Sequence, residues 1–231
     1  HALVAASLNH SDPVTKVTIL PRGRALGYTM VLPLEDRYSV SRNQLLDQIA
    51  YAMGGRVAEE LVFGDPTTGA SNDFEKATNI ARTMITQYGF SNSIGAVSYG
   101  NGGEVFIGRD MAQQRDYSES TAQIIDAEVR SFVEAAHEEA YKALMTNREI
   151  LDNLARELMV KETLQADEIA EIFAKVKKLP KRKTWLSSAK RPVSTQAPIA
   201  IPAKASTTED AAAKPKAVRK PRAKKTEESG S

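Results

Sequence analysis

Residues 67–73 read TTGASND, and they run directly into a helical pattern that extends from about Asp73 to Tyr88. Apolar residues recur there every three or four positions, the spacing that places side chains on one face of a helix. We expect Ser71 or Asn72 to cap this helix, because short polar side chains satisfy the first backbone N–H groups. Gly89 is expected to end it. The stretch therefore predicts a helix whose first residue is the acidic Asp73.

The rest of residues 1–180 predicts a mainly α-helical fold with a small β-hairpin or sheet near the N-terminus. Two β-branched, roughly alternating segments, Val14–Leu20 and Gly27–Leu32, flank a turn and predict the hairpin. Apolar residues at helical spacing predict further helices over about His1–Leu8, Ser41–Phe63, Ser118–Met145, Asn147–Leu158 and Thr163–Val176.

Two adjacent glycines, Gly54 and Gly55, interrupt the helix predicted over Ser41–Phe63. Each glycine in a helix interior costs on the order of 1 kcal/mol relative to alanine. We therefore expect this pair to permit the close approach of a neighbouring backbone.

Charge divides the chain at about residue 180. Residues 1–180 carry 18 Lys and Arg against 25 Asp and Glu, whereas residues 181–231 carry 13 against 4, within an overall charge of +2. The second segment has almost no large apolar residues, so it cannot bury enough surface to offset its ordering entropy. The sequence thus predicts one domain over 1–180 and a disordered basic tail over 181–231.

Several functional classes are excluded by composition. The chain has no cysteine, which excludes disulfides and thiolate metal sites, and no apolar run approaches the 18 residues of a membrane span. The glycine-rich stretch Gly100–Gly103 lacks the Lys-Ser/Thr of a phosphate loop. We do not expect nucleic-acid binding by the tail, because Trp185 is its only aromatic residue for base stacking.

A series of short segments resembles the FtsH family of ATP-dependent zinc metalloproteases. The resemblance covers about residues 1–178, and its segments stand in the family's order. They are His1-Ala2-Leu3-Val4, Ile19–Gly23, Ala25–Thr29, Gly54–Leu61, Thr67–Asp73, Ala77-Thr78, Ala81-Arg82, Tyr88-Gly89 and Phe106–Arg109. It implies an FtsH-like metallopeptidase fold, a zinc cofactor, and cleavage of protein and peptide substrates.

The resemblance also implies the metal ligands. Zincins use two histidines at positions i and i+4 of a helix, with a glutamate after the first as general base. His1 matches the second histidine, so we expect a chain truncated inside the HExxH motif, without its general base and inactive alone. Asp73 matches the family's third ligand, and Glu59 or Glu60 is a candidate to hold a zinc-bound imidazole through a hydrogen bond.

Each of these residues has a simpler interpretation when it is taken alone. His1 is then a solvent-exposed terminal residue, Asp73 an ordinary acidic residue at a helix N-terminus, and Glu59 and Glu60 solvent-facing glutamates. The two other histidines, His10 in a turn and His137 on a charged helix face, are expected at the surface.

The family further implies a homohexamer, an upstream ATPase module that binds ATP, and upstream membrane segments that place the protein at the cytoplasmic face of the cell membrane. Such a protein degrades membrane and soluble proteins in quality control. The alternative is a catalytically inactive helical scaffold of the same fold that serves assembly. The strands Val14–Leu20 and Gly27–Leu32 are either an edge that pairs with substrate main chain or a purely structural hairpin.

Overall fold

The computed structural model describes residues 1–21, 27–33, 38–99, 116–188 and 190–196. Several sequence features fall outside these ranges: the turn residues Arg22-Gly23, the Gly100–Gly103 stretch and the Phe106–Arg109 segment. The chain divides into two units, His1–Val193 and Ser194–Ser231. The first unit thus extends past residue 180, and the predicted disorder of the tail stays a prediction.

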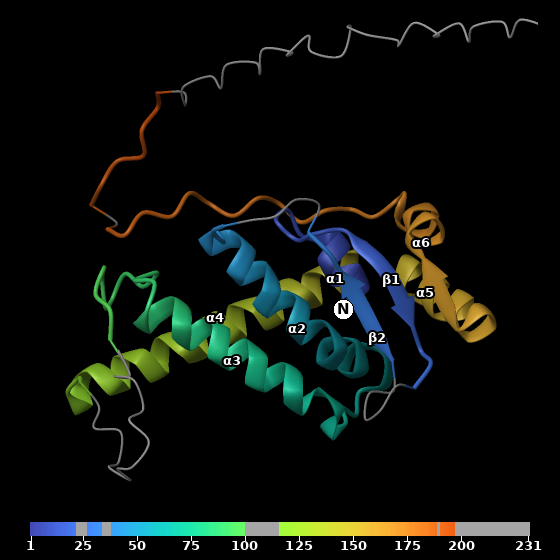
Figure 1. Ribbon diagram of the computed structural model, residues 1–231, viewed down its shortest axis with the longest axis horizontal. Helices are drawn as coiled ribbons and strands as arrows, with labels where there is room; N and C mark the ends of the chain where they lie inside the picture. Colours follow the sequence, from blue (N-terminus) through green and yellow to red (C-terminus); the bar gives the residue numbers. More distant parts are fainter. Residues whose placement is uncertain (22–26, 34–37, 100–115, 189, 197–231) are drawn as a thin grey trace, which may run out of the picture. The chain divides into compact units, whose positions relative to one another are not determined.

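The first unit is mostly helical and carries a small antiparallel sheet, as predicted (Figure 1). In chain order its elements are α1 (Ala2–Ser7), β1 (Val14–Thr18), β2 (Tyr28–Val31), α2 (Arg42–Phe63), η1 (Thr68–Ala70), α3 (Ser71–Thr86), α4 (Glu119–Thr146), α5 (Arg148–Lys161), β3 (Thr163–Gln165) and α6 (Ala166–Phe173).

The main core lies where α2 packs against α1, α3 and α4. Its largest fully buried apolar side chains come from all four helices and are Leu3, Val4, Ile49, Met53, Val57, Met84, Ile85, Ile125 and Leu144. Burying each large apolar side chain contributes about 1.5–3 kcal/mol, so these contacts set how the four helices lie against one another. Helix α1 is therefore an interior element, with Ala2 to Ala5 all buried.

Local signals set the boundaries of α2 and α3 to different degrees. Ser41 caps α2 in a capping box with Gln44, and Gly64 follows the helix with a left-handed φ of 68°. The predicted caps of α3 are wrong: Ala70 occupies the N-cap position, because the 3-10 turn η1 continues directly into the helix. Ser71 and Asn72 consequently lie inside the first helical turn.

The sheet has the strand order β2-β1-β3, with both pairs antiparallel. The predicted hairpin is confirmed, since Val17 pairs with Thr29. The helix predicted from Thr163 is wrong at its start: Thr163–Gln165 is the strand β3, in which Leu164 pairs with Val17. Because β3 covers the second side of β1, strand β1 is central and cannot be a substrate-binding edge.

A smaller core joins the sheet to α5 and α6, which lie beside it in Figure 1. Its buried members are Ala2, Val17, Leu154, Leu158, Leu164 and Ile169. Ala2 belongs to α1, so this helix connects the sheet with the helical core. Among the described residues, no helix combines the length and the apolar character needed to cross a bilayer.

Candidate metal site

His1 lies at the N-terminal end of α1, and its two ring nitrogens have different partners. Nδ1 is 2.8 Å from the carbonyl oxygen of Tyr51, and Nε2 is 3.4 Å from Oδ2 of Asp73. A carbonyl oxygen only accepts hydrogen bonds, so the proton of the neutral imidazole belongs on Nδ1. Nε2 then presents its lone pair toward Asp73. An imidazole with its proton on Nδ1 can bind a metal ion through Nε2.

The two glycines of α2 make room for this histidine. A Cβ atom on Gly55 would lie 2.7 Å from His1 Nε2, and one on Gly54 would lie 3.0 Å from the His1 backbone nitrogen. The predicted close approach at Gly54-Gly55 is therefore confirmed, and the neighbour is the start of α1. Any side chain at residue 55 would fill the space beside the lone pair of Nε2.

Asp73 stands in the first turn of α3. The side chains of His1 and Asp73 are 29% and 26% exposed, so solvent reaches both. An imidazole nitrogen and a carboxylate oxygen are typical zinc ligands, and two such atoms on a tetrahedral zinc ion lie roughly 3.4 Å apart. The pair therefore fits zinc in both chemistry and spacing.

In the described part of the chain, no group of three or more His, Cys, Asp or Glu side chains is placed to hold a metal ion. His1 and Asp73 together could therefore offer a metal ion two protein ligands. A catalytic zinc site uses three protein ligands plus water.

Glu59 contacts the TTGASND segment rather than His1. Its carboxylate accepts hydrogen bonds from the Thr67 backbone N–H (2.7 Å) and hydroxyl (2.9 Å). These two bonds, the backbone one foremost, lower the pKa of Glu59 below its ordinary value. Because Thr67 precedes the turn that leads into α3, Glu59 ties α2 to the segment that positions Asp73.

Glu60 lies between the side chains of Arg56 and His137. Arg56 Nε is 2.5 Å from one carboxylate oxygen, and His137 Nε2 of α4 is 3.1 Å from the other. The hydrogen bond from Arg56 is the main reason why the pKa of Glu60 is lowered. His137 is one-third exposed and His10 is exposed, so both lie at the surface as expected.

In this structure the Tyr51 carbonyl accepts the hydrogen bond from Nδ1 of the His1 imidazole, and the role of Glu59 or Glu60 toward a zinc-bound imidazole stays a prediction. The Tyr51 ring also lies against His1, with ring centroids 5.2 Å apart. Burial, and then the charge of Asp73, raises the pKa of the Tyr51 hydroxyl. That hydroxyl donates to the Thr29 carbonyl of β2 at 3.4 Å, so Tyr51 connects the candidate site with the sheet.

A cavity of about 530 Å³ adjoins Tyr51 between α2 and the end of β2. Its lining residues are Ala5, His10, Ser11, Asp12, Val31, Pro33, Val40, Gln44, Gln48 and Tyr51. The cavity combines apolar walls with amide and hydroxyl groups, as pockets for small ligands or single side chains commonly do.

Comparison with known proteins shows several relatives of this chain. The chain is 55% identical to the ATP-dependent zinc metalloprotease FtsH of Cutibacterium acnes over 212 residues, and this match covers 91% of the chain. It is 47% identical to FtsH of Mycobacterium leprae over 87% of this chain, and 54% identical to FtsH 4 of Sorangium cellulosum over 79%.

The matches cover 30%, 26% and 28% of these three relatives, so the chain spans less than a third of the curated relatives it matches. The sequence model of peptidase family M41 matches residues 1–172, which include His1, the glycine pair and Asp73. The chain therefore belongs to peptidase family M41.

Proposed function

We propose that this chain is part of the peptidase region of a membrane-anchored, ATP-dependent zinc endopeptidase that degrades membrane and soluble proteins. The observation that carries the proposal is the position of His1 Nε2, 3.4 Å from Asp73 Oδ2, while the Tyr51 carbonyl holds Nδ1. Its relatives are named as ATP-dependent zinc metalloproteases, which supports the assignment of the metal.

In this proposal, His1 Nε2 and the Asp73 carboxylate hold the zinc ion. Bound zinc supplies a Lewis acid that polarises the scissile carbonyl and lowers the pKa of its water. Tyr51 keeps the imidazole in the metal-binding tautomer through its carbonyl oxygen. The remaining histidine ligand and the general-base glutamate are proposed to come from the sequence that precedes His1 in the motif.

Substrate binding is proposed at strand β2. Because β1 lies between β2 and β3, strand β2 is an edge strand of the described sheet. It is also the strand that Tyr51 contacts, through the Thr29 carbonyl. An exposed strand edge pairs with the main chain of an extended peptide and so accepts many sequences. That property suits a protease with a broad set of protein substrates.

The assembly is proposed from the membership of the chain in family M41. A homohexamer with an upstream ATPase module would deliver unfolded substrate to β2, and upstream membrane segments would hold it at the cytoplasmic face of the membrane. The relatives are named as ATP-dependent proteases, which supports the ATP dependence.

The test is made in the full-length protein with Asp73→Ala and, as its control, Glu75→Ala on the same helix. Asp73→Ala should lose its zinc, measured by metal analysis, and the hydrolysis of unfolded casein. Glu75→Ala should keep both. An Asp73→Ala protein that retains zinc and activity would refute the metal site, whereas a wild-type protein that assembles without zinc or hydrolysis would favour the inactive scaffold.

A further inference from the structure

The chain that follows α6 passes across the end of α1. We call residues Lys177–Arg182 the strap. Its Leu179 N–H donates to the Ser7 carbonyl at 2.8 Å, and its Lys178 ammonium donates to the Leu8 carbonyl at 3.1 Å. The Ser7 carbonyl belongs to the last turn of α1 and the Leu8 carbonyl to its C-cap residue, where carbonyl groups have no partner inside the helix. A cation there also complements the negative end of the helix dipole.

One end of the strap is held by Asn147, a residue between α4 and α5 that is only 2% exposed. Its side chain accepts from the Lys177 N–H at 2.8 Å and donates to the Lys177 carbonyl at 3.0 Å. The same amide group donates to the Ser7 hydroxyl at 3.2 Å. Asn147 thus joins the strap, the junction of two helices and the end of α1.

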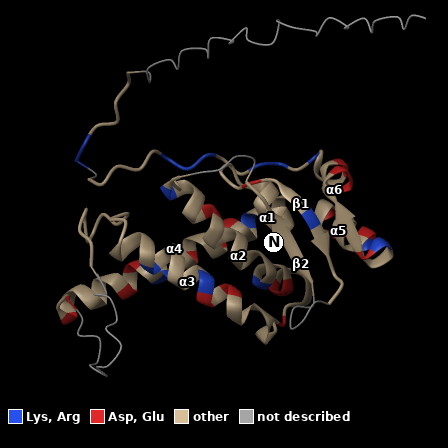
Figure 2. Cartoon of the chain, in the orientation of Figure 1, with Lys and Arg blue, Asp and Glu red and all other residues tan. Residues whose placement is uncertain are grey.

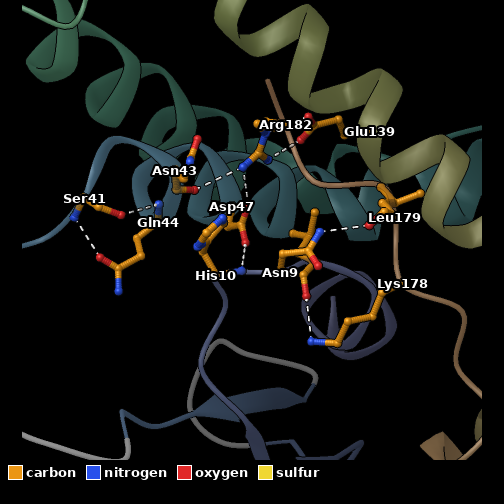
Figure 3. Close-up of polar contacts among 11 residues, drawn as sticks. Asn9, His10, Ser41, Asn43, Gln44, Asp47, Glu139, Lys178, Leu179 and Arg182 are labelled. Carbon is orange, nitrogen blue, oxygen red and sulfur yellow. Dashed lines mark hydrogen bonds and ion pairs between the residues drawn. The ribbon is translucent and has the colours of Figure 1, made fainter. Parts of the chain in front are cut away.

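The other end of the strap is held by Arg182, as Figure 3 shows. Its guanidinium donates to Asp47 of α2 at 2.5 Å, to the Asn43 carbonyl at 3.2 Å, and to Glu139 of α4. Asp47 is 1% exposed, and its second oxygen accepts the His10 N–H at 2.7 Å. One buried carboxylate therefore binds both the strap and the chain that leaves α1.

Directional contacts are needed here because the surface of α1 is apolar. Ala2 to Ala5 are buried by hydrophobic contacts, which depend on area and have no preferred direction. Such contacts hold the helix in the core through close packing but do not require one particular direction of approach. Hydrogen bonds and ion pairs have defined lengths and angles, so the contacts at the C-terminal end of α1 help to fix its axial position and thereby the position of His1 at its other end.

We propose that Arg182 and Asp47 form a lock that closes the strap over α1 and thereby positions His1. Arg182 is then a positioning residue for the metal ligand, supplied by the basic stretch that follows α6 (Figure 2). The role assigned to His1 rests on the proposed function. The lock itself rests on the contacts of the strap.

The test uses the full-length protein with Arg182→Met, which keeps an unbranched apolar side chain and removes the guanidinium. The control is Arg148→Met, because Arg148 makes an exposed ion pair with Asp152 on α5. Hydrogen–deuterium exchange is followed in peptides covering α1 and the buried part of α4, and zinc affinity is measured by competition with a chelator. The spectrum of bound Co²⁺ reports the ligand geometry.

Arg182→Met should speed exchange in α1 about tenfold more than exchange in buried α4, which reports the loss of global stability. Zinc affinity should fall by about 10–100-fold, the range typical of residues that orient a metal ligand, and the Co²⁺ spectrum should change. Arg182→Lys should recover part of the affinity, since it keeps the charge but not the forked geometry. Arg148→Met should behave as wild type.

Two results would overturn the lock. The first is an Arg182→Met protein with the α1 exchange and zinc affinity of the control. The second is an Arg182→Met protein in which exchange speeds up equally in α1 and α4, which would indicate a general structural role. In that case Lys178→Met, a milder change in the strap, is measured as well. The lock is overturned if Lys178→Met also fails to speed exchange selectively in α1. Failure of the proposed function is distinguished by His1→Ala: if it leaves zinc affinity unchanged, the metal assignment is wrong, whatever α1 exchange shows.

Discussion

Gly55 lies directly beside the imidazole of His1, so close that a Cβ atom at residue 55 would stand 2.7 Å from Nε2. Helix α2 thus carries a glycine where alanine would favour the helix by about 1 kcal/mol. The glycine lowers the stability of α2, but it leaves space beside His1 Nε2, the nitrogen that faces Asp73.

Gly55→Ala should therefore separate metal binding from stability. We expect zinc affinity to fall at least about tenfold, because the imidazole must move away from Asp73, a disturbance comparable to the loss of an orienting contact. The thermal midpoint should fall little, since helix propensity partly offsets the clash. Isothermal titration with zinc and a thermal melt test the two effects, and unchanged zinc affinity would contradict the position given to His1.

Glu59 should make the structure around Thr67 sensitive to acid. Its pKa is lowered in the folded state, so its contribution is fully present above the unfolded pKa and is lost as the pH falls through the folded value. Stability should thus decline below the ordinary value of 4.5.

The measurement is the thermal midpoint of wild type and Glu59→Gln between pH 3 and 7. The difference between the two proteins should be largest near pH 7 and should vanish in acid, because a protonated Glu59 and a glutamine are both neutral. Glu75→Gln provides the matched control. A difference that does not change with pH would exclude the charge-assisted bond to Thr67.

Truncation at two points should show where the folded unit ends. A chain that stops at Val193 should melt as the 231-residue chain does, because the compact unit extends to Val193. A chain that stops at Pro180 lacks Arg182 and leaves Asp47 buried without its cation. Removing one partner of a buried ion pair costs about 3–5 kcal/mol, so this midpoint should fall by several degrees. Equal midpoints would show that the strap ends before Arg182.

Two methionines offer a direct test of the core. Met84 of α3 is fully buried between helices, whereas Met159 of α5 is 79% exposed. Met84→Ala should lower the free energy of unfolding by about 2–5 kcal/mol, and Met159→Ala should change it by less than about 0.5 kcal/mol. Denaturant unfolding measures both, and similar values for the two variants would contradict the packing of α3.

The helices were predictable because their signals are local. Apolar spacing predicts α2 and α4 to within about a residue of their observed ends, and Ser41 and Ser118 cap them as short polar residues commonly do. Strand β3 was missed because three residues carry too weak a pattern. Thr163–Gln165 is a strand since β1 lies beside it, which is a non-local fact.

The candidate site divides in the same way. The chemical types of His1 and Asp73, the glycine pair and the family were readable from residues and motifs, because side-chain chemistry is written in the sequence. The acceptor for the imidazole was not, since every residue carries the same carbonyl group and only the crossing of α1 over α2 selects that of Tyr51. Likewise, composition alone assigned Arg182 to a disordered tail, and the tertiary structure brings it to Asp47 because a buried carboxylate needs a cation beside it.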